Sequence, residues 1–338
     1  MRSTLLLRSC ARALAASLVF AHATAAFAYL KFGVTINGRP VTLKWARTPV
    51  RYSVTDRGAA GLAATDLQAA AGRAFATWES VPTASIAYQF AGYTSALPGE
   101  DDGLSTLGFM NRPDLARVLA STSFLVDNVT GELLESDIFF NAAFAWSISP
   151  GGETGKFDLE SIALHEIGHL SGLGHSALGE TELRPEGGRR VVAAEAIMFP
   201  IAFPAGTVSA RTLRDDDVAG ISDLYPDNGV TANTGSISGR VTKNGQGVFG
   251  AHVVAFDVAR GGMVANFSLT TAGEFVIAAL APGPHVLRVE PLDDADVDEF
   301  FGASRTVDSS FRVSFSDRLV VVPRGGDSGV IEMKVVPK

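Results

Sequence analysis

One string of eleven residues constrains this chain more than any other feature: His165-Glu166-Ile167-Gly168-His169-Leu170-Ser171-Gly172-Leu173-Gly174-His175. His165 and His169 are four residues apart, so a helix presents both imidazoles on one face, as two ligands of one metal ion require. Gly172 permits the positive φ of a tight reversal, which brings His175 back as a third ligand. Three protein ligands leave the fourth position of a zinc ion open to water, the arrangement typical of catalytic sites.

Glu166 adds a proton acceptor to this string. It follows His165 directly and therefore points about 100° further round the helix, where it can reach a metal-activated water without binding the metal. We assign it as the general base. The competing interpretation is that these are ordinary helix and loop histidines, but three of the six histidines of the chain fall in this one string. His252 and His285 lie in strand-like segments, and we expect them to be packed or solvated rather than ligands.

The first 28 residues predict a signal peptide. They contain Arg2, Arg8 and Arg12 but no acidic residue, then an apolar stretch at 13–20 and the cleavage signal Ala26-Phe27-Ala28. That stretch is too short to span a bilayer, and no later segment offers about 18 uninterrupted apolar residues. We therefore expect a secreted, extracellular protein, or a periplasmic one if the source is Gram-negative, without a membrane anchor after cleavage.

Charge and cysteine content exclude several classes of protein. The formal net charge is −8, and loss of three arginines with the leader makes it −11, so nucleic acid is not an expected partner. The single cysteine, Cys10, lies in the leader. The processed chain therefore has no disulfide, which argues against a small disulfide-stapled extracellular module.

Hydrophobic periodicity predicts an α+β domain over residues 29–226. Asn37-Gly38 is a strong hairpin signal between strand-like runs at 32–36 and 41–45, and we expect this hairpin to join the sheet. Further strands are expected at 50–54, 85–90, 121–126 and 133–140, and helices at about 63–80, 158–171 and 213–225.

A second domain is expected after a polar, turn-rich linker at residues 227–235. Residues 236–338 contain six short strand-like runs separated by glycine and proline turns, which predicts a small all-β sandwich. The composition of the linker predicts few contacts across it, so residues 29–226 should fold alone.

The long histidine string resembles that of the metzincins, and Ser176 directly after it resembles the matrixin branch, which includes the matrix metalloproteinases. Residues 196–200 are similar to the family's Met-turn, with Met198 beneath the zinc. Asp216 and Asp217 begin a segment similar to the family's C-terminal helix, whose aspartates anchor that turn. The resemblance covers roughly residues 44–226. It implies a metzincin-type domain with a twisted mixed sheet and three helices. It also implies a zinc endopeptidase that acts on proteins or peptides bound along an edge strand. We expect residues 121–126 to form that edge strand.

Alternative interpretations remain for the supporting residues. The alternative for Met198 is a simple core methionine. The alternative for Asp216 and Asp217 is a solvated charge cluster at a helix start. The acidic run at 293–299 does not support calcium, because an EF-hand loop from Asp294 would need glycine where Glu299 stands. We expect a solvated acidic loop there.

Two departures from matrixins matter. His175 and Met198 are 23 positions apart, further than is usual in that family, and we expect the polar extra stretch at 179–190 to form a loop near the specificity pocket. Residues 29–164 contain no histidine, so we expect one catalytic zinc and no second, structural zinc. The region before the catalytic domain, 29–55, has no Cys, Asp, Glu or His, so we expect no latency through a zinc-binding switch.

The region after residue 235 weakly resembles the prealbumin-like, carboxypeptidase regulatory-like domains of secreted enzymes. Such a domain could bind a surface or substrate, or act as a spacer. The competing function for the whole chain is a non-catalytic adhesive or scaffolding protein with a vestigial metal centre, against which the presence of Glu166 argues. A zincin with a distant glutamate as third ligand is disfavoured by Gly172 and His175. The sequence assigns no oligomeric state.

Overall fold

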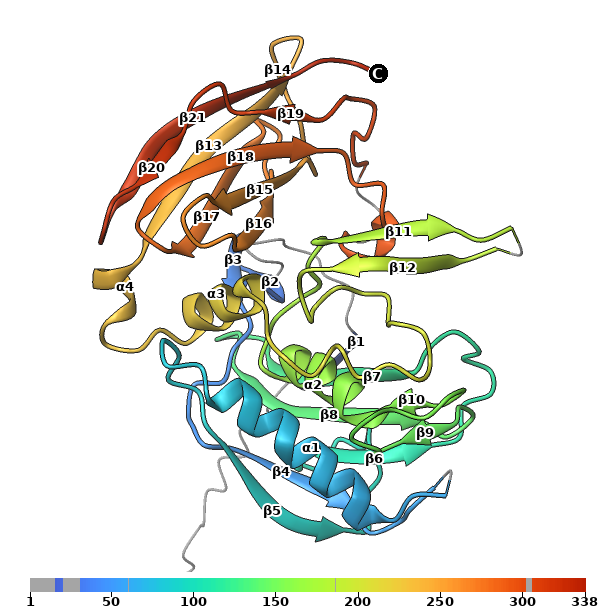
Figure 1. Cartoon of the computed structure of the whole chain (residues 1–338). Helices are drawn as coiled ribbons and strands as arrows, with labels where there is room; N and C mark the ends of the chain where they lie inside the picture. Colours follow the sequence, from blue (N-terminus) through green and yellow to red (C-terminus); the bar gives the residue numbers. More distant parts are fainter. Residues whose placement is uncertain (1–15, 21–30, 60, 186, 302–305) are drawn as a thin grey trace, which may run out of the picture.

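The structure is a computed structural model that describes the chain except residues 1–15, 21–30, 60, 186 and 302–305. An α+β part built around one mixed sheet packs against a β-rich part made of the C-terminal strands (Figure 1). The α+β fold class predicted for the first part is therefore confirmed. The proposed cleavage site, Cys10 and most of the proposed leader lie outside the described residues. No helix in the described part of the chain combines the length and the apolar character needed to cross a membrane.

The main sheet is six-stranded and mixed, in the order β1-β7-β8-β6-β4-β5. Its strands are β1 (Ala16–Phe20), β4 (Val50–Thr55), β5 (Tyr88–Thr94), β6 (Thr106–Met110), β7 (Ala120–Asp127) and β8 (Leu133–Asn141). Strand β4 runs parallel to β5 and β6, and β6 parallel to β8. Strand β7 is antiparallel to β8, and β1, the described portion of the proposed leader, is antiparallel to β7.

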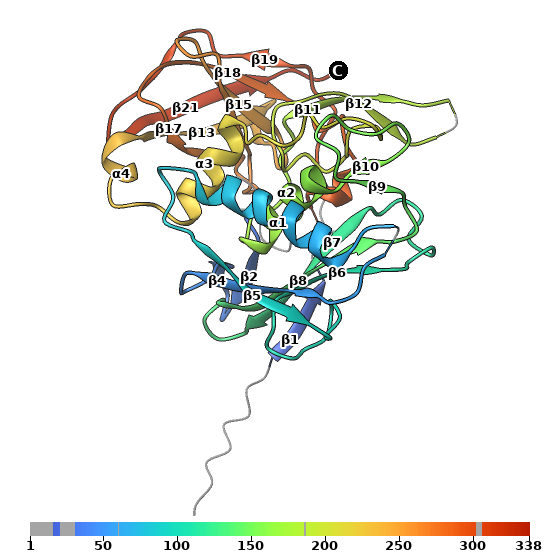
Figure 2. The ribbon, with the colours of Figure 1, turned by 60° about the horizontal axis from the view of Figure 1, so that its bottom comes forward.

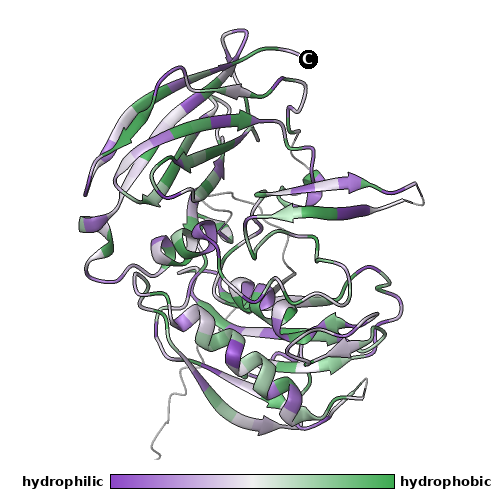
Figure 3. Cartoon of the chain, viewed as in Figure 1, coloured by the Kyte–Doolittle hydropathy of each residue, from purple (hydrophilic) through white to green (hydrophobic). Residues whose placement is uncertain are grey.

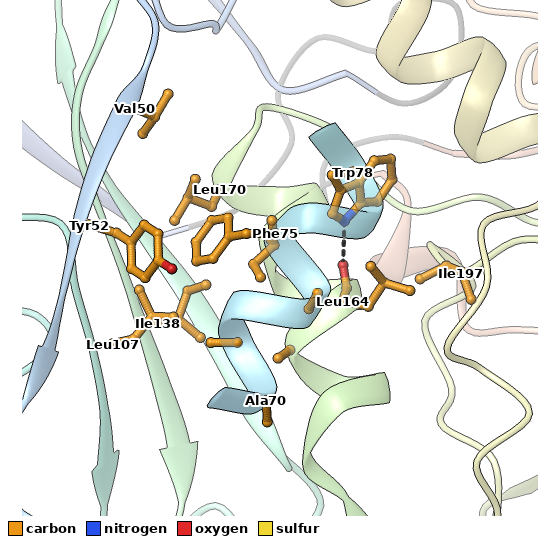
Figure 4. Close-up of a cluster of buried hydrophobic side chains, with 14 of the residues drawn as sticks. Val50, Tyr52, Ala70, Phe75, Trp78, Leu107, Ile138, Leu164, Leu170 and Ile197 are labelled. Atoms are coloured by element: carbon orange, nitrogen blue, oxygen red, sulfur yellow. Dashed lines mark hydrogen bonds between the residues drawn. The ribbon is translucent and has the colours of Figure 1, made fainter. Parts of the chain in front are cut away.

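Helices α1 (Ala64–Glu79) and α2 (Leu159–Leu170) pack together against this sheet, and α3 (Asp215–Leu224) lies toward the C-terminal part (Figures 1 and 2). Their apolar faces meet the sheet in a buried cluster (Figure 4). Within it, Phe75 stacks on Tyr52 with 3.9 Å between ring centroids. Trp78 donates its indole N–H to the carbonyl of Leu164 at 2.8 Å, so its polar atom is satisfied in the core.

The N-terminal hairpin does not join the main sheet, contrary to expectation. Strands β2 (Gly33–Ile36) and β3 (Arg39–Thr42) form a two-stranded sheet of their own around Asn37-Gly38, which both have positive φ. Phe32 and Leu43, which flank the hairpin, instead pack against the apolar cluster of β7 and β8. Side-chain packing and isolated backbone bridges, such as Lys44 with Glu132 and Lys31 with Leu173, therefore place this segment.

Short strands complete the first part. Strand β9 (Trp146–Ser147) pairs with β10 (Phe157–Asp158), which leads directly into α2. The stretch expected to be a loop contains a hairpin, β11 (Gly179–Leu183) and β12 (Arg189–Ala194), which projects from between the two parts (Figure 1).

The C-terminal part contains two sheets. One has the order β14-β13-β17, with β21 parallel to β13, and the other has the order β16-β15-β18-β19, with β20 paired to β18. Apolar and polar positions alternate along many of these strands (Figure 3), and the apolar ones share a core that includes Val253, Ile277 and Leu287. The bounds are α4 (Val230–Asn233), β13 (Gly235–Lys243), β14 (Gln246–Gly247), β15 (His252–Asp257), β16 (Met263–Phe267), β17 (Glu274–Leu280), β18 (Gly283–Glu290), η1 (Val297–Glu299), β19 (Ser314–Phe315), β20 (Val320–Val322) and β21 (Asp327–Val335).

The two parts share an extensive interface, and the expectation of few contacts across the linker is wrong. Helix α3 contacts β16 and β17, and the backbone N–H of Ala265 donates to Asp216 Oδ1 at 2.8 Å. Two apolar clusters also cross the interface, one of them joining Leu178 to Val254 and the other joining Ala177 to Phe300. The polar, turn-rich composition of residues 227–235 does not reveal this, because the contacts are made by residues outside that segment.

Candidate metal centre

Helix α2 and the turn after it position the three histidines. The carboxylate of Asp158 accepts the backbone N–H of Ser161 at 3.0 Å, which caps the start of the helix. The chain reverses after the helix at Gly172, which has a φ of 101°. A Cβ at this position would lie 2.6 Å from the carbonyl oxygen of Leu43, so glycine is required by both conformation and space.

The imidazoles of His165, His169 and His175 converge as the sequence predicted. One ring nitrogen from each lies within 4.8 Å of the others, and the Nε2 atoms of His169 and His175 are 3.2 Å apart. Each Nδ1 lies 2.8 Å from a backbone carbonyl, that of Ile197, Leu173 and Glu299 respectively. A carbonyl can only accept, so each Nδ1 carries the hydrogen and each Nε2 keeps its lone pair for a ligand.

The electrostatics of the site keep these rings neutral. Burial lowers the pKa of His165, and lowers that of His175 to about 3 with a further contribution from the nearby His165. The pKa of His169 is lowered by burial and by both neighbouring histidines. Neutral imidazoles are the protonation state that binds a metal. Three such nitrogens on a rigid helix and turn fit a zinc ion with an open fourth position.

Glu166 lies beside this nitrogen cluster and is buried. The hydroxyl of Thr122 on β7 donates to Glu166 Oε2 at 2.6 Å and so fixes the orientation of the carboxyl. Burial raises the pKa of Glu166 to about 7, although the Thr122 hydrogen bond acts in the opposite direction. A carboxyl with a pKa near neutrality can both take up and release a proton under ordinary conditions.

Met198 lies directly beneath the ligand helix. A Cβ at Gly168 would come within 2.3 Å of Met198 Sδ, so glycine in α2 allows the close approach. The carboxylate of Asp217 accepts the backbone N–H groups of Ile197, at 2.8 and 3.0 Å, and of Met198, at 3.1 Å. Asp217 therefore links helix α3 to the turn that carries Met198.

Asp216 has a different partner from Asp217. It accepts hydrogen bonds from the backbone of Ala265 and the side chain of Ser176, and so faces the C-terminal part. Burial raises its pKa to about 7, and burial raises that of Asp217 to about 6. Both aspartates are buried, unlike a solvated cluster at a helix start.

A cleft of about 640 Å³ opens over the histidines and Glu166. The residues of β7 that line it are Ala120, Ser121 and Thr122, and β12 contributes Arg189 and Ala194. The C-terminal part supplies Asp296, Asp298, Glu299 and Phe300. These four were missed by sequence reasoning, which placed the acidic run in a solvated loop, and no local pattern marks them as part of a site.

Comparison with known proteins agrees with this geometry. A family model described as Matrixin matches residues 44–185. Residues 44–185 of this chain therefore resemble a matrixin domain. The matrixin match includes all three histidines and Glu166 but ends before Met198 and α3.

Several plant metalloendoproteinases are similar to part of this chain. Metalloendoproteinase 1-MMP of Arabidopsis thaliana is 28% identical over 226 residues, which cover 62% of this chain and 49% of that protein. Metalloendoproteinase 4-MMP of the same plant is 28% identical over 219 residues, covering 61% and 54%. Metalloendoproteinase 1 of Glycine max is 46% identical over 72 residues, covering 21% and 18%. The chain thus spans about half the length, or less, of these curated relatives.

Proposed function

We propose that this protein is a secreted zinc-dependent endopeptidase that hydrolyses peptide bonds of protein substrates. His165, His169 and His175 hold one zinc ion, and Glu166 is the general base. The observation that carries the proposal is the convergence of three neutral imidazole nitrogens in a cleft, with a buried carboxyl beside them. The matrixin match and the metalloendoproteinase names of the relatives support the same class of reaction.

The chain's own residues account for the proton transfers of hydrolysis. When bound, zinc supplies Lewis acidity that polarises a carbonyl and lowers the pKa of water. Glu166 takes the proton from the attacking water and returns it to the leaving amine. The hydrogen bond from Thr122 keeps the carboxyl in place for both steps.

Strand β7 offers an edge at which an extended substrate can bind. Ala120, Ser121 and Thr122 line the cleft, whereas the pairing of β1 with β7 begins at Ser123. A peptide can add to the edge of a sheet through backbone hydrogen bonds alone. Removal of residues 1–28 in secretion would also take away β1 and leave this edge of β7 longer.

Met198 and Asp217 are proposed as structural supports of the ligand helix. Met198 contacts α2 at Gly168, the residue before His169. Asp217 accepts hydrogen bonds from the turn that carries Met198. Asp216 supports the same region through Ser176, the residue after the third histidine.

The substitution Glu166→Gln tests the proposal. We expect it to lower kcat by about 10²-fold or more, because an amide cannot accept the proton, while one zinc per chain remains bound. Activity is followed with casein and a quenched fluorescent peptide, and zinc by metal analysis of the purified chain.

Glu160→Gln is the matched control, since Glu160 lies on the same helix but pairs with Arg73 and Arg211. It should keep its activity. Full activity in Glu166→Gln would assign the base to another residue. A wild-type protein that holds no zinc and cleaves nothing would favour the adhesive or scaffolding alternative.

A further inference from the structure

The third histidine is held differently from the first two. His165 and His169 project from α2, and their Nδ1 atoms bond to carbonyls of the α+β part, those of Ile197 and Leu173. His175 lies in the loop after the Gly172 reversal. Its Nδ1 bonds to the carbonyl of Glu299 at 2.8 Å, a residue 124 positions further along the chain and in the C-terminal part.

The segment that carries this carbonyl is fixed against the α+β part. The backbone N–H of Thr181 donates to Asp294 Oδ1 at 2.8 Å, and its hydroxyl donates to the carbonyl of Asp294 at 2.6 Å. Arg189 donates to the carbonyl of Asp293 at 3.0 Å. The hairpin β11–β12 thus holds the residues just before η1 through hydrogen bonds. This hairpin lies in the stretch in which this chain departs from matrixins.

Phe300 adds an apolar contact to the same histidine. Its ring is 1% exposed and meets the ring of His175 edge-on, with 6.2 Å between centroids and an interplanar angle of 75°. On its other side it packs against Phe267 of β16 at 5.5 Å. The third ligand therefore lies between a carbonyl that orients its N–H and a phenyl ring that restricts its rotation.

We propose that the C-terminal part completes the metal centre, with Glu299 and Phe300 as positioning residues for His175. The carbonyl of Glu299 fixes the Nδ1–H tautomer, and Phe300 limits rotation of the ring, so Nε2 stays directed at the ion. This rests on the proposed zinc site formed by the three histidines. Partners of this kind in the second shell of a metal typically change metal affinity by about 10- to 100-fold.

The same segment forms one wall of the cleft. Asp298, Glu299 and Phe300 line the same cleft as the three histidines and the β7 residues. The C-terminal part is thus a component of the active site rather than an appended spacer. Its removal would take away one of the three carbonyls that orient the ligands.

The test compares Phe300→Ala with Phe301→Ala in the full-length secreted chain. Phe301 is a matched control, because it is the next residue, is equally buried and packs on Phe249 and Phe267 in the same cluster. The structure records a ring contact with His175 for Phe300. Zinc affinity is measured by competition with a chelator, the visible spectrum of the cobalt(II)-loaded protein reports ligand geometry, and thermal unfolding of the metal-free proteins reports stability.

We expect Phe300→Ala to weaken zinc binding about tenfold or more and to alter the cobalt spectrum. Phe301→Ala should lower the unfolding temperature to a similar degree but keep zinc affinity within about twofold of wild type and leave the cobalt spectrum unchanged. Equal effects of the two substitutions on zinc affinity, or no effect of Phe300→Ala, would overturn the proposal.

If the alanine variants fail to fold, Phe300→Leu and Phe301→Leu replace them, because leucine keeps an apolar side chain but lacks the ring contact. The same comparison then decides the outcome. Failure of wild-type protein to bind zinc would instead refute the proposed function. Zinc binding and cleavage by wild type, with unaltered affinity in the Phe300 variants, would refute only the role of the C-terminal part.

Discussion

Gly172 shows how one residue without a side chain decides where a ligand lies. Its φ of 101° reverses the chain after α2, and the carbonyl of Leu43 occupies the space that a Cβ would need. Both conditions must hold for His175 to return to the other two histidines. The eleven-residue string predicted this geometry because it depends only on local spacing and on the conformational freedom of glycine.

Gly172→Ala should therefore destabilise the fold by about 2 kcal/mol or more, since alanine is strained at positive φ and also clashes with backbone. Zinc affinity should fall with it, because His175 shifts. Gly151→Ala is the comparison, as Gly151 has open space around its Cβ position. Urea unfolding of both variants measures the difference, and equal stability would contradict this account of the turn.

At the scale of elements, the sequence predicted some parts well and others poorly. Helices α1 and α2 fall within two residues of expectation, because hydrophobic periodicity is a local signal. Strand β6 was missed. Thr106, Leu107, Gly108 and Phe109 are all buried between β4 and β8, so the strand shows no alternation of polar and apolar residues. The role of Glu299 was also missed, because a backbone carbonyl that reaches a partner 124 residues away leaves no mark in the local sequence.

Helix α3 fixes the turn that carries Met198. Its first turn holds the Met198 turn through Asp217, which accepts three backbone N–H groups, those of Arg214, Ile197 and Met198. Asp217→Ala leaves these donors without an acceptor, and we expect a loss of about 3 kcal/mol or more in the free energy of unfolding. Asp215→Ala removes an exposed carboxylate from the same turn and should cost much less. Chemical denaturation compares the two, and similar losses would show that Asp217 does not hold the turn.

At the scale of the whole molecule, the interface contains a buried acid. The pKa of Asp216 is raised to about 7 by burial, well above its ordinary value of 3.8. At a pH between these two pKa values, the carboxyl of Asp216 is ionised in the unfolded chain but protonated in the folded protein. Folding is therefore disfavoured increasingly as the pH rises from about 4 to about 7, and the full unfavourable contribution is present above that range.

Asp216→Asn removes this dependence, because asparagine is neutral and its amide oxygen can still accept the N–H of Ala265. We expect the stability of wild type relative to Asp216→Asn to fall between pH 4 and pH 7 by an amount on the order of a few kcal/mol. Denaturant unfolding of the metal-free proteins across this range measures the difference, so that zinc-linked protons do not contribute. Parallel pH profiles would show that folding does not raise the pKa of Asp216.

The strand order of the C-terminal part also bears on when during synthesis this part can be complete. Strand β13, the first of that part, lies between β17 and β21, and its pairing with β21 is parallel and spans from residue 236 to residue 335. A nascent chain lacks this neighbour until residues 327–335 have been synthesised. The contact between Glu299 and His175 is made by the same C-terminal part, so we expect tight metal binding at the proposed site to require β21 as well.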